Sequence, residues 1–411
     1  MPEALALTGC EAWTPLERIP DALLLAEGGR FAYVGPRGAL PLPPGIRKVE
    51  LGGAAVCPGL VDLQVNGLGP EAVLDGDPEG LLRLARALAR RGTTSFLPTA
   101  TASSPGDLLR AARAVREAWE RQQRARRAGA AILGLHLEGP CLNPLMRGAH
   151  PLEHIRPVDP AELERVGGAA GGFGPSGRPG LRLLTLSPEV EGAAGAARAM
   201  SARGVAVAMG HTAAADDEVE RFLAAGARFA VHAYNRYGAP GSGGASVPQA
   251  PGVLPPGPMA AVISDARLMA GLIADGVHVK PEAAASLVRM RGWARVALTS
   301  DLVSDRGLSG EAAGASLEER AVRRGGVLTG SRLSLGEMLP LYKEWTGLPA
   351  DLAVAAATQH PARLLSAQEE VGRLLPGARA DLCVLDPRTL EIRAVLAGGE
   401  WASGTLPFAA P

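Results

Sequence analysis

A repeated alternation of short apolar runs and amphipathic helical segments constrains the fold of this chain more than any other feature. Several of the amphipathic stretches are rich in Ala, Leu and Arg, at 78–92, 104–123, 215–226 and 281–292. The apolar runs end in polar or glycine residues and occupy 55–65, 93–101, 131–139, 181–189, 205–212, 227–235, 269–279 and 295–304. Strands that alternate with helices in this way predict a parallel sheet.

Eight such strands are the number that closes a (β/α)8 TIM-type barrel, and we predict this α/β fold for residues 56–369. The alternative is an open doubly wound sheet, which usually carries a glycine-rich phosphate turn after its first strand. The segment VNGLGPEA, which begins at Val65, matches that turn poorly. The barrel is therefore the preferred architecture.

The residue pattern of the two terminal segments differs from that of the middle of the chain. Residues 1–55 and 370–411 contain short strand-like pieces, such as ALALTG and ADLCVLD, separated by turn residues. We predict that both termini pair into one small β-sandwich domain beside the barrel. A Gly/Pro-rich loop, Gly238–Pro258, follows the sixth apolar run, and a loop of that length is either functional or mobile.

The composition argues against several classes of partner. Basic and acidic residues number 42 each, so no positive field favours nucleic acid or an anionic membrane. No apolar stretch reaches the ~20 residues needed to span a bilayer, and no secretory signal is visible. The four cysteines form no CxxC pair, which argues against a thiolate zinc site and predicts a reducing cytoplasm.

Polar residues gather where the predicted strands end, which is the face of a barrel that carries active sites. Glu138, His211 and His232 stand at the ends of the third, fifth and sixth runs. One carboxylate and two imidazoles suit a borderline divalent ion such as Zn²⁺, with one position open for water. Each histidine alone could equally be a hydrogen-bonded core residue, but the matching depth of all three favours a metal site.

Asp301 ends the eighth run, where a carboxylate could exchange a proton with water and a leaving group. The alternative is a capping or loop aspartate, a role that suits the nearby Asp305 better. His136 lies two residues before Glu138 on the same strand face. Whether it supports the metal ligands or only packs in the core is left open by the sequence.

The segment VDLQVNG alternates apolar residues with Asp62, Gln64 and Asn66, which a strand would send to one face. Buried amides and carboxylates are costly unless something binds them. These three residues therefore lie either on a wet outer face or in a site.

The motifs LGLHLEGPCLNPLMRGAH, MGHTAA, VHAYNRYGAPG, IADGVHVKP, ALTSD and LTGSRLSLGEML occur in an order that resembles the N-acetylglucosamine-6-phosphate deacetylase family of the amidohydrolase superfamily. The resemblance extends from about residue 50 to about residue 400, and HLEGP and ADGVHV are its most specific parts. It implies a (β/α)8 barrel beside a small β-sandwich, a homodimer, and hydrolysis of the acetamide of an amino sugar phosphate. The alternatives are N-acetylgalactosamine 6-phosphate or an unphosphorylated sugar as substrate, or a scaffold without catalysis.

By position, the resemblance makes Glu138, His211 and His232 the ligands of a divalent ion, with Zn²⁺ preferred and Fe²⁺ or Mn²⁺ as alternatives. Asp301 corresponds to the catalytic aspartate, and His150 lies near the acetyl carbonyl. The other implied substrate contacts are Ala149, Asn235, Arg236, His278 and the turn formed by Leu328, Thr329 and Gly330.

Gln64 and Asn66 stand where many amidohydrolases have two histidines that bind a second metal. Neutral amides are poor ligands for Zn²⁺, so the resemblance implies one ion per chain. The two amides can still hydrogen-bond to water or to the substrate. By the same resemblance, the face that carries them lines a site.

Two departures from the family pattern concern the phosphate. The residue after Asn235 is usually small but is Arg236 here, and Gly238–Pro258 contains no Arg or Lys where the family usually offers an arginine. Either Arg236 has taken over anion binding, or the substrate carries no phosphate. Because arginine suits bidentate phosphate contact, we favour the first alternative.

Overall fold

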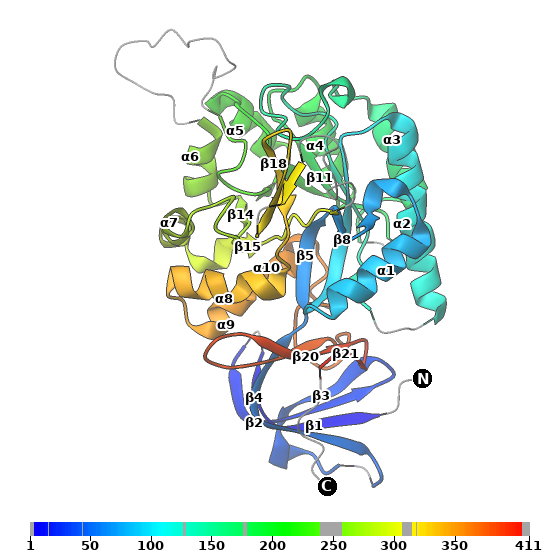
Figure 1. Cartoon of the computed structure of the whole chain (residues 1–411), viewed down its shortest axis with the longest axis vertical. Coiled ribbons are helices and arrows are strands. Elements are labelled where there is room, and N and C mark those ends of the chain that lie inside the picture. The colour runs from blue at the N-terminus through cyan, green and yellow to red at the C-terminus, as the bar shows by residue number, and fades with distance from the viewer. Residues whose placement is uncertain are drawn as a thin grey trace.

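The computed structural model describes residues 4–14, 16–42, 44–125, 129–175, 179–238, 257–305, 315–317 and 319–404. Figure 1 shows a barrel of strands wrapped by helices and, below it, a sheet formed by strands from the two terminal segments. This arrangement confirms the predicted α/β barrel with a separate β domain built from both termini.

The barrel strands follow one another around the sheet in the order in which they occur in the chain, and neighbouring strands are parallel. Almost all of their residues are buried, as expected for parallel strands that are covered on both faces. The strands are β5 (Leu60–Val65), β8 (Thr93–Thr101), β10 (Leu135–Glu138), β11 (Leu181–Leu186), β12 (Ala206–Met209), β13 (Phe229–Ala230), β14 (Met269–Leu272) and β15 (Val296–Leu298), and the short β9 (Ala131–Ile132) pairs with β8.

Helices cover the outside of the barrel (Figure 1) and begin at recognisable signals. Asp77 and Asp159 cap α1 and α3, and each helix has proline in its first turn, which favours helix initiation. The ten helices are α1 (Pro78–Ala89), α2 (Pro105–Ala125), α3 (Pro160–Ala170), α4 (Ala193–Ser201), α5 (Asp216–Ala224), α6 (Gly257–Ser264), α7 (Pro281–Arg291), α8 (Leu335–Thr346), α9 (Ala350–Ala355) and α10 (Gln359–Leu364), as far as the chain is described. No helix in these ranges is long and apolar enough to cross a membrane.

Short contacts close the gap between the first and last barrel strands, β5 and β15. At the carboxyl end, the backbone N–H groups of Asn66 and Gly67 donate to the carbonyl of Leu302 at 2.8 and 3.1 Å. The backbone N–H groups of Leu298, the last residue of β15, and of Val61 in β5 donate to the carbonyls of Ala356 and Ala357, both at 2.8 Å. The barrel is therefore nearly closed, and its mouth is held at Asn66, next to Asp301.

The terminal segments form one hydrogen-bonded sheet of seven strands in the order β21-β20-β19-β4-β1-β2-β3. The apolar run 55–65 is divided between two strands, because β4 belongs to this sheet and β5 to the barrel. Between them, a Cβ added to Gly59 would lie 2.0 Å from Thr94 Oγ1, so the crossing needs glycine. The strands are β1 (Leu5–Trp13), β2 (Arg18–Glu27), β3 (Arg30–Pro36), β4 (Arg47–Pro58), β19 (Leu382–Leu385), β20 (Ile392–Ala397) and β21 (Glu400–Ser403).

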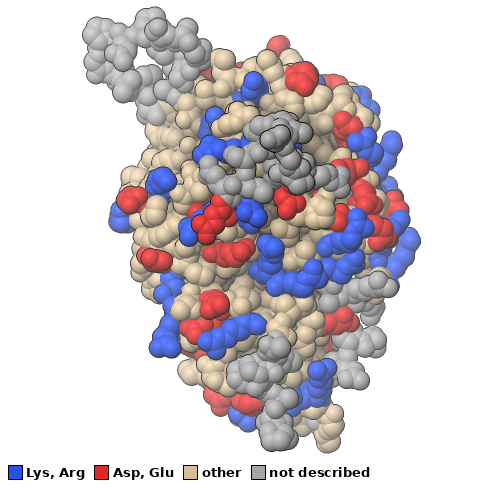
Figure 2. Space-filling view, viewed as in Figure 1, with Lys and Arg blue, Asp and Glu red and all other residues tan. Residues whose placement is uncertain are grey.

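A three-stranded antiparallel sheet lies over the barrel between β15 and α8, formed by β16 (Ala315–Leu317), β17 (Ala321–Arg324) and β18 (Val327–Ser331). A smaller hairpin, β6 (Gly67–Leu68) with β7 (Glu71–Ala72), follows β5. Most of the predicted Gly238–Pro258 loop, residues 239–256, lies outside the described residues. Figure 2 shows positive and negative side chains mixed over the visible face of the molecule.

Candidate metal-dependent active site

Four polar residues at the carboxyl ends of barrel strands converge at the barrel mouth. Glu138 is the last residue of β10, and Asp301 lies three residues after β15. His211 and His232 each lie two residues after their strands, β12 and β13. Three of the four have positive φ angles, of 51° at His211, 31° at His232 and 51° at Asp301. Such strained conformations persist only where the surrounding structure imposes them, and they cluster at functional sites.

Imidazole rings surround the Glu138 carboxylate. Its Oε1 lies 3.2 Å from His211 Nε2 and 3.0 Å from His232 Nε2, and its Oε2 lies 3.8 Å from His150 Nε2. Ligand atoms of Glu138, His150 and His211 all lie within 4.8 Å of one another, a spacing that one metal ion can bridge. The structure thus brings together the three predicted ligands and adds His150 to the cluster.

Burial and mutual contacts set the charges of this cluster. Burial opposes the ionisation of Glu138, but hydrogen bonds with His211 and His232 lower the pKa of its carboxyl well below the ordinary value. Burial also opposes protonation of His232, whose pKa is nevertheless raised because of its bond to Glu138. An ionised carboxylate at the base of a buried site favours a cation beside it.

The other ring nitrogen of two histidines faces a backbone carbonyl. His211 Nδ1 lies 3.0 Å from Met146 O, and His232 Nδ1 lies 3.2 Å from Asn235 O, so both nitrogens must donate. When neutral, each ring therefore presents an Nε2 lone pair to the Glu138 carboxylate. Two acceptors at this distance need a cation between them, either a proton or a metal ion.

His150 has the opposite arrangement. Its Nδ1 accepts a hydrogen bond from the backbone N–H of Ala102 at 3.2 Å, so the neutral ring carries its proton on Nε2, toward Glu138. Burial lowers the pKa of His150 to about 3, which keeps the ring neutral. His150 is thus arranged as a hydrogen-bond donor into the site.

Asp301 is held by the two amides of the alternating segment. Its Oδ1 accepts from Asn66 Nδ2 at 2.7 Å and from Gln64 Nε2 at 3.1 Å. Burial and then the negative charge of Glu138 raise the pKa of Asp301 well above the ordinary value. The structure therefore supports the alternative in which the VDLQVNG segment contributes to a site and not to a solvent-exposed face. Gln64 is only 1% exposed and contacts Asp301 of the site.

His136 lies in the barrel beneath this cluster, completely buried. Its Nδ1 lies 3.0 Å from Leu63 O and its Nε2 lies 2.8 Å from Thr185 Oγ1, so barrel groups engage both nitrogens. Burial lowers the pKa of His136 to about 4. These contacts favour a packing role over direct contact with a ligand.

A cavity of about 320 Å³ opens above the cluster. Gln64, His278 and Gly330 are not among its described lining residues, although Gln64 reaches the site through Asp301. The other predicted site residues all line it: Asn66, Glu138, Ala149, His150, His211, His232, Asn235, Arg236, Asp301, Leu328 and Thr329.

The other two predicted residues outside the lining, His278 and Gly330, also have structural partners. His278 Nδ1 lies 2.6 Å from Asp275 Oδ2, and its buried Nε2 has no hydrogen-bond partner among the described residues. Gly330 packs closely against the backbone of Asp301: a Cβ added to Gly330 would lie only 2.7 Å from the Asp301 carbonyl oxygen. Gly330 therefore contacts the backbone that carries Asp301, not the cavity.

Arg324 on β17 lines the cavity and was missed from the sequence. Arg236 and Arg324 are the two arginines of the described lining, whereas its carboxylates, Glu138 and Asp301, belong to the cluster. Arg236 lies against Gly148, where an added Cβ would meet Arg236 Nε at 3.0 Å. The available signal for Arg324 was its position four residues before the predicted Leu328 turn.

Comparison with known proteins relates this arrangement to known chemistry. The model of the amidohydrolase family matches residues 55–402. An N-acetylgalactosamine-6-phosphate deacetylase of Escherichia coli O157:H7 is 33% identical over 391 residues, which cover 94% of this chain and 96% of the relative. An N-acetylglucosamine-6-phosphate deacetylase of Bos taurus is 29% identical over 372 residues, which cover 85% and 84%.

A solved structure is similar over nearly the whole chain. The N-acetyl-D-glucosamine-6-phosphate deacetylase of Mycobacterium smegmatis has a TM-score of 0.80 and 30% identity, covering 98% of this chain and all of that one. A structure of a variant of the same mycobacterial enzyme in complex with N-acetyl-D-glucosamine-6-phosphate has a TM-score of 0.81.

Proposed function

The chain belongs to the amidohydrolase family, and we propose that it hydrolyses the acetamide of N-acetylglucosamine 6-phosphate, giving glucosamine 6-phosphate and acetate. The observation that carries the proposal is one cavity with a histidine–carboxylate cluster at its base and two arginines on its wall. The cluster suits hydrolysis of an amide, and the arginines suit a phosphate. Relatives named for this reaction, or for the galactosamine epimer, support the substrate class.

Glu138, His211 and His232 would hold one divalent ion, because their lone pairs face one another and their Nδ1 atoms are fixed by backbone carbonyls. Zn²⁺ is the preferred ion, and Fe²⁺ or Mn²⁺ accept the same ligands. When bound, the ion supplies Lewis-acid polarisation at the base of the cavity.

Asp301 would accept the proton of the attacking water and return it to the departing nitrogen. Gln64 and Asn66 hold its Oδ1, while its Oδ2 makes none of the hydrogen bonds found among the described residues. His150, with its proton on Nε2, would donate to the acetyl carbonyl oxygen as negative charge develops there.

We expect one tightly held divalent ion per chain. Gln64 and Asn66 replace the histidines of a second site, and their amides already donate to Asp301. Elemental analysis of the purified protein measures the stoichiometry, and two tightly held ions per chain would contradict this expectation.

Arg236→Ala and Arg324→Ala should each lower kcat/KM for the 6-phosphorylated substrate by about 10- to 150-fold, because each removes a charge-assisted hydrogen bond of roughly 1.5–3 kcal/mol. Hydrolysis of unphosphorylated N-acetylglucosamine should hardly change. Arg323→Ala is the matched control, since this neighbour on β17 does not line the cavity. Equal losses on both substrates would mean that the arginines are structural.

The test of the function is acetate release from a panel of N-acetylated sugars, with and without 6-phosphate. The galactosamine epimer is the second candidate, because the relative named for it is 33% identical over almost the whole chain. Faster hydrolysis of N-acetylgalactosamine 6-phosphate would reassign the substrate but keep the chemistry. No release from any member of the panel by metal-loaded protein would refute the proposal.

The resemblance to these deacetylases also supports a homodimer that works in the cytoplasm. The four cysteines are free and buried, which suits a reducing compartment. Light scattering of the purified protein measures the oligomeric state, and a monomer at micromolar concentration would contradict it.

A further inference from the structure

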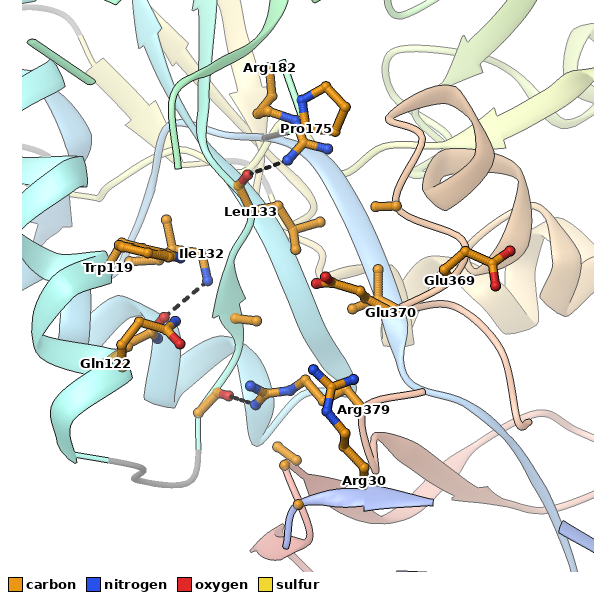
Figure 3. Close-up of a pocket in the computed structure, with 18 of the residues that line it drawn as sticks. Arg30, Trp119, Gln122, Ile132, Leu133, Pro175, Arg182, Glu369, Glu370 and Arg379 are labelled. Carbon is orange, nitrogen blue, oxygen red and sulfur yellow. Dashed lines mark hydrogen bonds between the residues drawn. The ribbon is translucent and has the colours of Figure 1, made fainter. Parts of the chain in front are cut away.

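A second cavity, of about 540 Å³, lies between the barrel and the terminal sheet. Figure 3 shows its wall, which includes Trp119 of α2, Arg182 near the start of β11, and Arg30 of the terminal sheet. This cavity lies at the amino ends of the barrel strands, opposite the carboxyl ends that carry Glu138. It is therefore separate from the candidate active site. Its volume is in the range of small-molecule sites, about 300–1,000 Å³.

Arg182 is built into this wall. It is 7% exposed, its Nη1 and Nη2 donate to the carbonyls of Leu133 and Leu365 at 3.3 and 2.6 Å, and its buried Nε has no partner among the described residues. Gly134 makes room for it, since an added Cβ would lie 2.2 Å from Arg182 Cγ. None of the ion pairs found in the described ranges includes Arg182. Burial lowers the pKa of its guanidinium, and the negative charge of Glu370 partly opposes this shift.

Two further guanidinium groups lie at the lower side of the cavity in Figure 3, those of Arg30 and Arg379. Arg379 is neutralised by Asp381, whose two oxygens accept from its Nε at 2.8 and 3.0 Å. Arg30 donates from Nη1 to the carbonyl of Gly377 at 2.7 Å and takes part in no ion pair of the described chain. This side of the cavity therefore carries net positive charge and free N–H donors, which suit an anion.

Glu370 lies between the two positive ends. Figure 3 shows its side chain turned into the cavity, whereas Glu369 turns away. Glu369 pairs with Arg373 at 2.9 Å, but Glu370 belongs to none of the ion pairs formed within the described ranges. The half-buried ring of Trp119 forms an apolar wall beside these charges.

We propose that this cavity binds a small phosphate monoester that also carries an amine. The phosphate would contact Arg30 beside Arg379, the ammonium would pair with Glu370, and hydroxyl groups would accept from the guanidinium of Arg182, which lines the cavity. Because the walls come from both the barrel and the terminal sheet, a ligand here stabilises the contact between them. The amino sugar phosphate released by the proposed reaction belongs to this class, and only that choice of probe rests on the proposed function.

The test is calorimetric titration of the metal-loaded protein with glucosamine 6-phosphate, which should show two sites per chain. Arg30→Gln should weaken one of them by about tenfold or more and leave KM for the acetylated substrate unchanged. Arg363→Gln is the matched control, because Arg363 is also exposed, donates to one carbonyl (Ala294, 3.0 Å) and lies outside the cavity. A single site that responds to Arg236→Ala alone would overturn the proposal.

The contribution of the buried Arg182 and that of the ligand's amine are tested separately. Arg182→Met should weaken the same site, whereas Arg291→Met, which removes another buried arginine bound to backbone carbonyls, should only lower stability. Glucose 6-phosphate, which lacks the amine, should bind to the wild type about tenfold more weakly than glucosamine 6-phosphate does. The two sugars should bind to Glu370→Gln with equal affinity. Equal binding of both sugars, or of inorganic phosphate, to the wild type would overturn the proposal. A protein that fails to release acetate but keeps the Arg30-dependent site would refute the proposed function alone.

Discussion

Asp301→Asn is expected to lower kcat by about 10²–10⁴-fold while the protein keeps its divalent ion and still binds substrate. An amide in this position cannot take up the proton of the attacking water. The substitution should not disturb the backbone, because Asp301 has φ of 51°, a region that asparagine tolerates well. Acetate release measures kcat, and elemental analysis measures the retained ion.

Asp305→Asn is the matched control, because it removes the same charge from the same loop at a residue that does not line the cavity. It should have near-normal turnover. If Asp301→Asn also turned over normally, another group would have to exchange the proton. If the Asp301→Asn variant lost the divalent ion, Asp301 would be a metal ligand instead.

His211→Asn and His232→Asn should each lose the ion and activity together. Each substitution removes an Nε2 that faces the Glu138 carboxylate at 3.2 or 3.0 Å, and amides are poor ligands for Zn²⁺. Lewis-acid stabilisation worth about 4 kcal/mol or more corresponds to at least about a 10³-fold loss of kcat. Asparagine is preferred to alanine here because both histidines have positive φ angles, of 51° and 31°.

His154→Asn is the control for this pair, since His154 lines the same cavity but is outside the metal cluster. It should keep one ion per chain. His150→Asn should also keep the ion while lowering kcat, because the His150 proton points into the site from Nε2. Loss of the ion in His150→Asn would assign His150 as a ligand and contradict the donor role.

The barrel and the positions of the candidate metal ligands could be predicted from the sequence alone. Apolar runs that alternate with amphipathic, glycine-terminated segments are local signals, and parallel strands in a barrel bring their carboxyl ends to one face. That rule is enough to predict that Glu138, His211 and Asp301 approach one another, although they come from three distant segments. The structure agrees, with all three on the wall of one cavity.

Other features depend on contacts between segments that no local pattern encodes. The tautomers that distinguish His150 from His211 follow from backbone groups of Ala102 and Met146, which only the folded chain brings to the rings. The contact of Gln64 with Asp301 spans 237 residues.

The two cavities show the same division. Arg324 lines the cavity of the candidate active site because the hairpin that contains β17 folds over the barrel mouth. The sequence around Arg324 does not reveal that this hairpin folds there. The cavity around Arg182 exists only where turns of the terminal sheet meet the bottom of the barrel. Sequence alone thus determined the barrel and which residues stand at its strand ends, because both follow from local periodicity. The tertiary structure decided which donors, charges and walls surround them, because those come from segments that meet only after folding.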